Sequence, residues 1–496
     1  MGSALTALEA QIRDDLAKTS HPNAAWLEPK RGPDGKPALD VLIVGAGQSG
    51  LATAFGLMRS QVTNILIVDR AEEGKEGPWL SYARMRTLRS PKDFTGPDLD
   101  IPSLTYQSWH EARFGKEDWG DLDLIPRELW ADYLLWFKHA VGLTVRNGCE
   151  LLEIVPASDG LLAATVECGD ATETLYARKI VLATGQEAMG NWTVPEPLRH
   201  LPARLLALAS DRIDFGALAG KTVAVIGAGA TAFDNAATAL EAGAAEVHLL
   251  CRRAEIQLIQ PYRWLTFRGF LRHFCDLDDA WRWRFMRAIL ELREGFPQAT
   301  YDRCAQFANF HLHEGTPIEA AREVGDAVEL RTPRGIVSAN FVICGTGTDI
   351  DVAERRELGK FADNIATWAD RYDPPESERS PRLGRYPYLA DDYAFTERVP
   401  GKTPWISNIH LFAFASTMSF GPSGSSINAM TTAIPKLVYG LTRGLFRADL
   451  ERHWNSFKAY DVPQAVIARQ KQAAEERMIG TGLNGAKIFG CGPGPF

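Results

Sequence analysis

Two glycine-rich turns in this sequence have the spacing that lets backbone N–H groups contact a diphosphate. In the first, Gly45, Gly47 and Gly50 follow the apolar run "DVLIV" and precede residues with helical spacing. The first glycine of such a turn allows the tight bend, the second lets a pyrophosphate approach, and the third lets helix and strand pack closely. Asp69 ends the next apolar run, 19 residues beyond Gly50, where a carboxylate can accept hydrogen bonds from ribose hydroxyls. We expect this turn, Asp69 and the adjacent Arg70 to bind a dinucleotide, and the acid suits FAD.

The second turn repeats the pattern with a different ending. Gly227, Gly229 and Ala232 follow the apolar run "TVAVI". The next apolar run, "EVHLLCRR", ends in Arg252 and Arg253 rather than in an acid. A basic pair at this point suits a 2′-phosphate, so the pattern predicts NADPH rather than NADH. The alternative interpretation is that the two arginines are solvent-exposed residues at the end of a strand and bind no cofactor.

Strand–turn–helix units must position both turns, so the sequence predicts an α/β fold with two Rossmann-type domains, the NADP domain inserted into the FAD domain. Residues 256–320 exceed a minimal NADP domain and are aromatic, basic and helical in pattern. They could line the substrate pocket, form a lid or a dimer face, or add a core layer. The predicted parts are an N-terminal helical extension (1–37), the FAD domain (38–190 and 335–446), the NADP domain (191–334) with its helical insertion (256–320), and a C-terminal tail (447–496).

Composition narrows the classes of partner. The chain has 496 residues, 45% of them hydrophobic, and a net charge of −8. This acidity argues against nucleic acid as a partner, and no apolar window reaches the length of a membrane span, so membrane association is not expected. The seven cysteines show no CxxC pair and no metal-type spacing. We therefore expect no metal site, no redox dithiol and a reducing, cytoplasmic location. The N-terminal segment is charged and does not have the pattern of a signal peptide, which also favours a cytoplasmic location.

Over residues 38–445 the chain resembles the class B flavin-dependent monooxygenases, a group that includes flavin-containing monooxygenases, Baeyer–Villiger monooxygenases and N-hydroxylases. Beyond the two turns, "EGPWL", "LRSPKDFTGPDLDIP", "KIVLATGQE" and "GPSGSS" carry the resemblance. It implies cofactor contacts in these four segments. The residues concerned are Trp79, Lys92, Asp93, Gly185, Gly421, Pro422, Ser423 and Ser426. The last segment is expected to start a helix aimed at the flavin.

One position departs from the flavin-containing monooxygenases. Arg89 stands where they carry an asparagine near the flavin. A cation there could stabilise a peroxide or oxyanion, so Arg89 is the single candidate catalytic residue. The alternative is a surface ion pair.

The resemblance implies an NADPH- and O2-dependent FAD monooxygenase that inserts one oxygen atom into a small organic substrate, at a heteroatom or a carbonyl, through a C4a-(hydro)peroxyflavin. A homodimer is a further expectation, because residues 256–320 could form a dimer face. The histidine motif F-x-G-x-x-x-H-x-x-x-W that Baeyer–Villiger enzymes carry is absent from "PARLLALASDRIDFGALAGK". Its absence argues against Baeyer–Villiger chemistry and favours one alternative, an NADPH-dependent flavin dehydrogenase or oxidase without oxygen transfer. The second alternative is a non-catalytic FAD/NADP-binding sensor.

Overall fold

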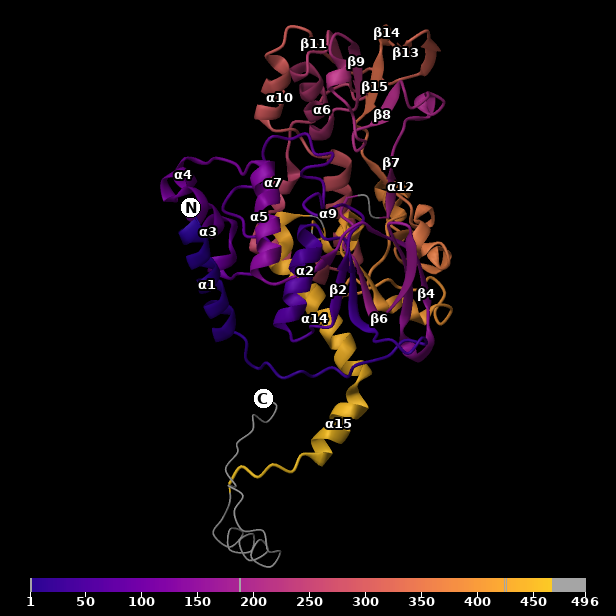
Figure 1. The fold of residues 1–496 in the computed structure, drawn as a ribbon. Helices are drawn as coiled ribbons and strands as arrows, with labels where there is room; N and C mark the ends of the chain where they lie inside the picture. The colour runs from indigo at the N-terminus through magenta and orange to yellow at the C-terminus, as the bar shows by residue number, and fades with distance from the viewer. Residues whose placement is uncertain (1, 187–188, 423, 425, 466–496) are drawn as a thin grey trace, which may run out of the picture.

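The protein, described here from a computed structural model, consists of two layers, each built around its own β-sheet with flanking helices (Figure 1). The structure describes residues 2–186, 189–422, 424 and 426–465. In Figure 1 the second sheet lies above the first, and the FAD- and NADP-type turns belong to different sheets. This confirms the predicted α/β fold with two dinucleotide-binding units.

The first sheet has seven strands in the order β3-β2-β1-β6-β5-β4, with β17 also pairing β6. Helix α2 (Gln48–Arg59) connects the parallel strands β1 and β2, and α14 (Met430–Ala448) packs against α2. Apolar side chains of these elements form one large core. The strands are β1 Leu39–Val44, β2 Ile65–Val68, β3 Val145–Arg146, β4 Cys149–Pro156, β5 Leu162–Cys168, β6 Ala171–Leu182 and β17 Ile409–Leu411.

The second sheet has five parallel strands in the order β11-β10-β9-β15-β8. Helices α6 (Ala230–Glu241) and α10 (Gln298–Ala305) cover one face. A meander of β12 (Ala320–Val324), β13 (Ala327–Thr332) and β14 (Gly335–Ala339) covers the other. The strands are β8 Leu206–Leu208, β9 Thr222–Ile226, β10 Glu246–Leu250, β11 Phe310–His313 and β15 Phe341–Cys344.

The chain passes between the sheets twice, and the two crossings lie side by side. Strand β7 (Gly190–Trp192) leads toward the second sheet and pairs antiparallel with β16 (Thr348–Ile350) on the return. Because β14 and β15 belong to the second layer, the return follows Cys344 rather than starting at residue 335. The predicted boundary at 334/335 is therefore too early.

The predicted insertion, 256–320, divides between the two layers. Its first helices bury Phe270 and Trp283 in the core of the first sheet, whereas α10 and β11 complete the second. The helices concerned are α7 Pro261–Leu265, α8 Arg268–His273 and α9 Asp279–Leu292. Hence only residues 256–292, which end with α9, are additional to the second layer, and their helices pack against the first layer.

Further helices flank the first sheet. Helix α1 packs against α3, and α15 follows α14 at the end of the described chain, where it projects from the body (Figure 1). No helix among the described residues is long and apolar enough to cross a membrane. The remaining helices are α1 Gly2–Lys18, α3 Tyr106–Phe114, α4 Lys116–Asp121, α5 Arg127–Ala140, α11 Trp368–Arg371, α12 Pro381–Gly384, α13 Thr417–Phe420 and α15 Leu450–Ala459.

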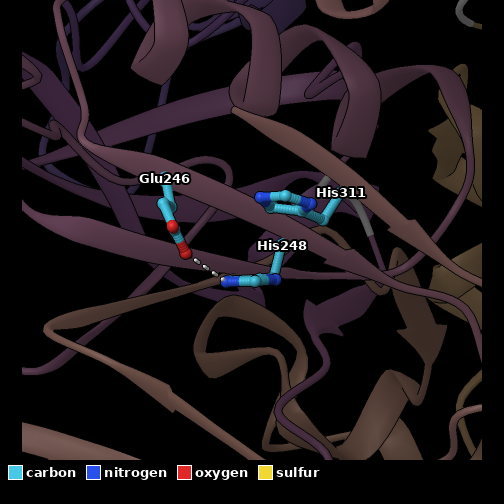
Figure 2. A group of neighbouring side chains, drawn as sticks. All are labelled: Glu246, His248 and His311. Atoms are coloured by element: carbon cyan, nitrogen blue, oxygen red, sulfur yellow. Dashed lines mark hydrogen bonds and ion pairs between the residues drawn. The ribbon is translucent and has the colours of Figure 1, made fainter. Parts of the chain in front are cut away.

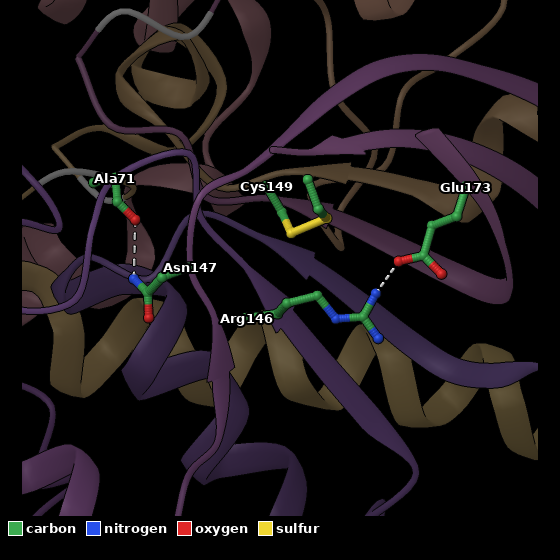
Figure 3. Close-up of a disulfide and its surroundings, with 6 residues drawn as sticks. Ala71, Arg146, Asn147, Cys149 and Glu173 are labelled. Atoms are coloured by element: carbon green, nitrogen blue, oxygen red, sulfur yellow. Dashed lines mark hydrogen bonds and ion pairs between the residues drawn. A yellow bond between two sulfur atoms is a disulfide. The ribbon is translucent and has the colours of Figure 1, made fainter. Parts of the chain in front are cut away.

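A disulfide joins neighbouring strands of the first sheet. Cys149 of β4 and Cys168 of β5 are register partners with Cα atoms 4.2 Å apart, and their sulfur atoms are bonded (Figure 3). The search for CxxC pairs and metal-type spacing did not predict this disulfide, because the pairing depends on the register of the hairpin. Cys251, Cys275, Cys304 and Cys344 are free thiols, and Cys491 lies outside the described residues.

Candidate active site

Steric limits in the first turn separate the roles of its three glycines. Gly45 has φ +104°, and a Cβ there would lie 2.4 Å from the carbonyl oxygen of Ala183. A Cβ on Gly50 would lie 1.8 Å from the carbonyl oxygen of Gly45. Both positions therefore need glycine for packing. At Gly47 the nearest atom to such a Cβ is 3.9 Å away, on Gly77, so this glycine leaves the start of α2 open to a ligand.

A cavity of about 830 Å³ opens from this turn and reaches α6 of the second layer. Its size is that of a site for a large cofactor or ligand. Thr231 and Asp234 of α6 form part of its wall, so the cavity lies between the two layers. The predicted site residues in the wall are Gly45, Gly47, Asp69, Arg70, Trp79, Arg89 and Gly185.

Several buried polar atoms of the cavity wall have no protein partner among the described residues. They are Nε1 of Trp79, Oγ1 of Thr184, and Nε of both Arg84 and Arg89. Buried donors without partners are rare in folded proteins and indicate an absent ligand or water. A flavin dinucleotide, with its ring heteroatoms and hydroxyl groups, fits this set of donors.

Asp69 supports the turn as well as the cavity wall. Its Oδ2 accepts a hydrogen bond from the backbone N–H of Ala46 at 2.7 Å, and its Oδ1 accepts one from Ala71 at 2.7 Å. The carboxylate thus fixes the glycine turn directly. Each oxygen keeps a further lone pair, so the predicted contact to a ribose stays possible and remains a prediction.

Lys92 and Asp93 do not line the cavity. The Lys92 ammonium donates to the carbonyl oxygen of Trp119 at 2.7 Å and lies 4.7 Å from the centre of the Trp119 ring. Asp93 is exposed. The structure therefore gives no support to their predicted cofactor contacts, since Lys92 instead stabilises the end of α4.

The predicted flavin-proximal segment, 421–428, is tied to the first turn of α2. The hydroxyl of Ser49 donates to the carbonyl oxygen of Gly424 at 2.8 Å. A 3-10 turn, Ile427–Ala429, precedes α14, so a helix does follow the glycine-rich turn as expected. The described members Gly421, Pro422 and Ser426 are not in the cavity wall, and Ser423 lies outside the described residues.

The second turn repeats the geometry of the first. Gly227 has φ +122°, and a Cβ there would lie 2.4 Å from the carbonyl oxygen of Gly345. At Gly229 a Cβ would meet no atom of the described residues within 4 Å. Ala232 is accommodated because its neighbour is Gly345, where a Cβ would lie 2.8 Å from that of Ala232. Sequence reasoning missed Gly345, which its place after the strand "FVIC" could have suggested.

The two arginines after β10 are in different situations. Arg252 is exposed. Arg253 donates to the carbonyl oxygens of Leu292 at 3.0 Å and Glu291 at 2.9 Å, at the C-terminal end of α9. Only Arg252 is thus left for the predicted 2′-phosphate contact, while Arg253 anchors a helix.

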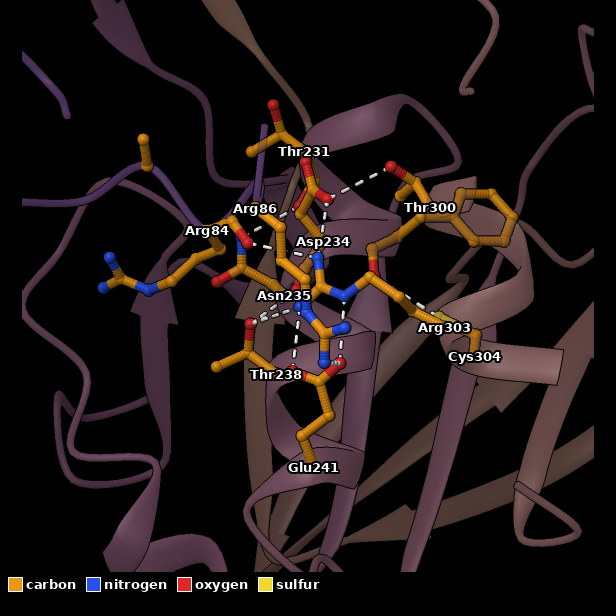
Figure 4. A network of polar contacts seen from close by, with 12 residues as sticks. Arg84, Arg86, Thr231, Asp234, Asn235, Thr238, Glu241, Thr300, Arg303 and Cys304 are labelled. Atoms are coloured by element: carbon orange, nitrogen blue, oxygen red, sulfur yellow. Dashed lines mark hydrogen bonds and ion pairs between the residues drawn. The ribbon is translucent and has the colours of Figure 1, made fainter. Parts of the chain in front are cut away.

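Arg89, the predicted catalytic cation, takes part in an ion-pair network between the layers. Its Nη2 lies 2.9 Å from Oδ2 of Asp234, which is 2% exposed. Figure 4 shows that Asp234 also contacts Thr300 and Arg303. Arg303 also pairs with Glu241 at 2.9 Å. Burial raises the pKa of Asp234, and the two guanidinium groups oppose that shift. The charge of Arg89 is therefore largely balanced by Asp234.

Arg84 is a cavity residue that sequence reasoning missed. Its guanidinium donates to the carbonyl oxygens of Ser81 at 2.8 Å and Asp211 at 3.3 Å and lies 5.4 Å from the Phe215 ring centre. No described carboxylate pairs with it. Burial lowers the pKa of Arg84, and the nearby Arg127 adds to that effect. It is thus a cation without a counter-charge in the cavity wall, ready for an anion.

Comparisons with known proteins agree with this geometry. An FAD-NAD(P)-binding family profile matches residues 42–187, and the L-lysine 6-monooxygenase/L-ornithine 5-monooxygenase profile matches residues 120–263. The chain is 38% identical over 464 residues to the FAD-dependent urate hydroxylase of Xanthomonas campestris pv. campestris, covering 93% of this chain and 97% of that protein.

Solved structures share the fold at low sequence identity. The ornithine hydroxylase of Pseudomonas aeruginosa aligns with a TM-score of 0.64 and 16% identity, over 82% of this chain and 100% of that one. The L-lysine 6-monooxygenase of Pseudomonas syringae aligns with a TM-score of 0.61 and 20% identity, over 82% and 99%. At these identities the likeness carries the fold alone.

Proposed function

Because the chain belongs to the class B flavin-dependent monooxygenases, and within them to the family of the FAD-dependent urate hydroxylase of Xanthomonas campestris, we propose that its substrate is urate or a closely related oxidised purine. It is an NADPH- and O2-dependent FAD monooxygenase. The reaction would balance as urate + O2 + NADPH + H⁺ giving hydroxylated urate + NADP⁺ + H2O. The identity over 93% of the chain is the observation that carries the proposal.

Arg84 is the residue we assign to the substrate. Urate is a planar anion near neutral pH, and a guanidinium matches the adjacent oxygen and nitrogen acceptors on the edge of such a ring. Arg84 lines the cavity and lacks a carboxylate partner among the described residues. A urate anion bound next to Arg84 would supply the missing counter-charge.

The cofactors would be held by the two turns. Gly47 and Gly229 leave room for the diphosphates of FAD and NADPH, and Trp79 Nε1 and Thr184 Oγ1 offer unpaired hydrogen-bonding groups to the flavin. Bound FAD supplies the hydride acceptor and the oxygen-activating centre. The cavity between the layers would exclude water from that centre.

Arg89 stays the candidate catalytic residue, in a changed role. Since Asp234 balances its charge, we assign it hydrogen-bond donation through its unpartnered Nε rather than a net positive charge. This donor would stabilise negative charge that develops beside the flavin.

An Arg84→Met variant tests the substrate assignment. We expect the KM for urate to rise about tenfold or more, because an ionic hydrogen bond contributes roughly 1.5–3 kcal/mol, while FAD content stays unchanged. Arg86→Met is the matched control, since Arg86 is exposed and pairs with Glu241 outside the cavity. Equal KM values for urate in the two variants would refute the role of Arg84. Failure of urate to accelerate NADPH oxidation in the unaltered protein would refute the substrate proposal itself.

The predicted homodimer and cytoplasmic location remain predictions. Sedimentation of the purified holoprotein tests the first, and fractionation of the source cells tests the second.

A further inference from the structure

Four ionisable side chains gather on one face at the edge of the second sheet, away from the cavity. Glu246 and His248 alternate along β10, and His311 and His313 alternate along the edge strand β11. The register places His248 opposite His311 and Leu250 opposite His313. Figure 2 shows Glu246, His248 and His311 converging.

The polar atoms of this group are close enough to share one ion. His248 Nε2 lies 3.2 Å from Oε2 of Glu246, and His248 Nδ1 lies 3.0 Å from Nε2 of His313. The rings of His248 and His311 stack with centroids 4.8 Å apart and planes at 21°. One ligand atom from each of Glu246, His248 and His311 lies within 4.8 Å of the others.

We propose that Glu246, His248 and His311 bind a divalent transition-metal ion of the zinc class, with His313 as a positioning residue. Tetrahedral Zn²⁺ has nitrogen and oxygen ligands at about 2.0–2.2 Å, so its ligand atoms are about 3.3 Å apart. The separation of Glu246 and His248 already matches this geometry. The ligand atom of His311 lies within 4.8 Å of the other two, so a rotation of the His311 ring toward the ion would complete the set.

His313 would orient the central ligand. When Nδ1–H of His248 donates to Nε2 of His313, the lone pair of His248 Nε2 faces Glu246 and the ion. Partners of this kind fix the tautomer of metal-bound histidines. Glu246 supplies the negative charge, and as a partly exposed side chain it leaves a coordination position to water.

The expected absence of a metal site rested on cysteine count and local spacing. The two strands that supply these ligands are far apart in sequence, since His248 and His313 are 65 positions apart. Only the parallel pairing of β10 with β11 brings the ligands together. A bound ion would clamp the edge strand to its neighbour.

Zinc binding by the tag-free holoprotein, dialysed against chelator, tests the proposal. In competition with a chromogenic zinc indicator, we expect one equivalent of Zn²⁺ to bind and to raise Tm. His248→Phe should abolish this binding, and His313→Phe should weaken it about 10- to 100-fold. The matched control is His139→Phe, because His139 is exposed and lies on α5 of the first layer.

The flavin absorbance of each variant shows whether it is folded. If His248→Phe does not retain FAD, His311→Gln carries the same test with the same expected loss. Absence of stoichiometric zinc binding in the unaltered protein would overturn the proposal. Equal zinc affinity in the folded site variant and in His139→Phe would overturn it as well.

Discussion

Alanine at Gly229 would add a methyl group that meets no described protein atom within 4 Å, at a backbone position with φ −82°. The folded state should therefore tolerate it, with a change in the free energy of unfolding within about 1 kcal/mol. The methyl group would stand where the NADPH diphosphate must approach the start of α6. A loss of about 1.4 kcal/mol or more in binding corresponds to a tenfold or larger rise in the KM for NADPH.

Gly227→Ala is the matched control for this variant. The methyl group would sit at φ +122° and 2.4 Å from the carbonyl oxygen of Gly345. Left-handed strain of about 1–2 kcal/mol and a displaced strand at about 1–3 kcal/mol together predict a loss of roughly 2–5 kcal/mol in stability. Thermal unfolding, FAD content and stopped-flow reduction by NADPH separate the two effects. A KM for NADPH within twofold of the unaltered value in Gly229→Ala would contradict the role of Gly229, and a Gly227→Ala variant as stable as the unaltered protein would contradict the role of Gly227.

Two further predictions follow from the charges. Arg252→Ala should reduce the preference for NADPH over NADH by about tenfold or more, because one ionic hydrogen bond to the 2′-phosphate is lost. Arg253→Ala should instead lower Tm, because the C-terminal end of α9 loses two hydrogen bonds. Equal NADPH preference in both variants would contradict the assignment of Arg252 to the 2′-phosphate. Burial, helped by Lys179, lowers the pKa of His410 to about 4. The unfolded chain therefore binds more protons between pH 6.5 and 4, and stability should fall by about 3 kcal/mol as the pH drops through this range. His410→Asn, whose amide can replace the donor to the Asp392 carbonyl, should flatten this part of the stability curve measured by urea unfolding, and an unchanged slope would contradict it.

Local backbone requirements made the two turns predictable from sequence. Gly45 and Gly227 adopt positive φ beside a neighbouring strand. In the sequence, this requirement shows as a glycine directly after a short apolar run. The order of the layers followed from the same pattern, because each turn implies a strand before it and a helix after it. Long-range packing was not visible in this way. The division of residues 256–320 between the two cores depends on which apolar face each helix meets, and composition alone does not record it.

The candidate site was predicted in part for the same reason. Gly47 and Asp69 were identified because their spacing is fixed by one strand–turn–helix unit. Arg84 was missed because its distinguishing feature is the lack of a carboxylate partner among the described residues, and this feature depends on its neighbours in space. Arg89 was found, but its pairing with Asp234 comes from another domain and changes its role.

The most direct test of the account is the fate of molecular oxygen during turnover. Purified yellow holoprotein is supplied with NADPH, urate and ¹⁸O2, and the product mass is compared with that of an unlabelled reaction. We predict a product containing one ¹⁸O atom for each NADPH consumed. Oxidation of NADPH to NADP⁺ with hydrogen peroxide as the oxygen product, and urate recovered unchanged, would contradict the account.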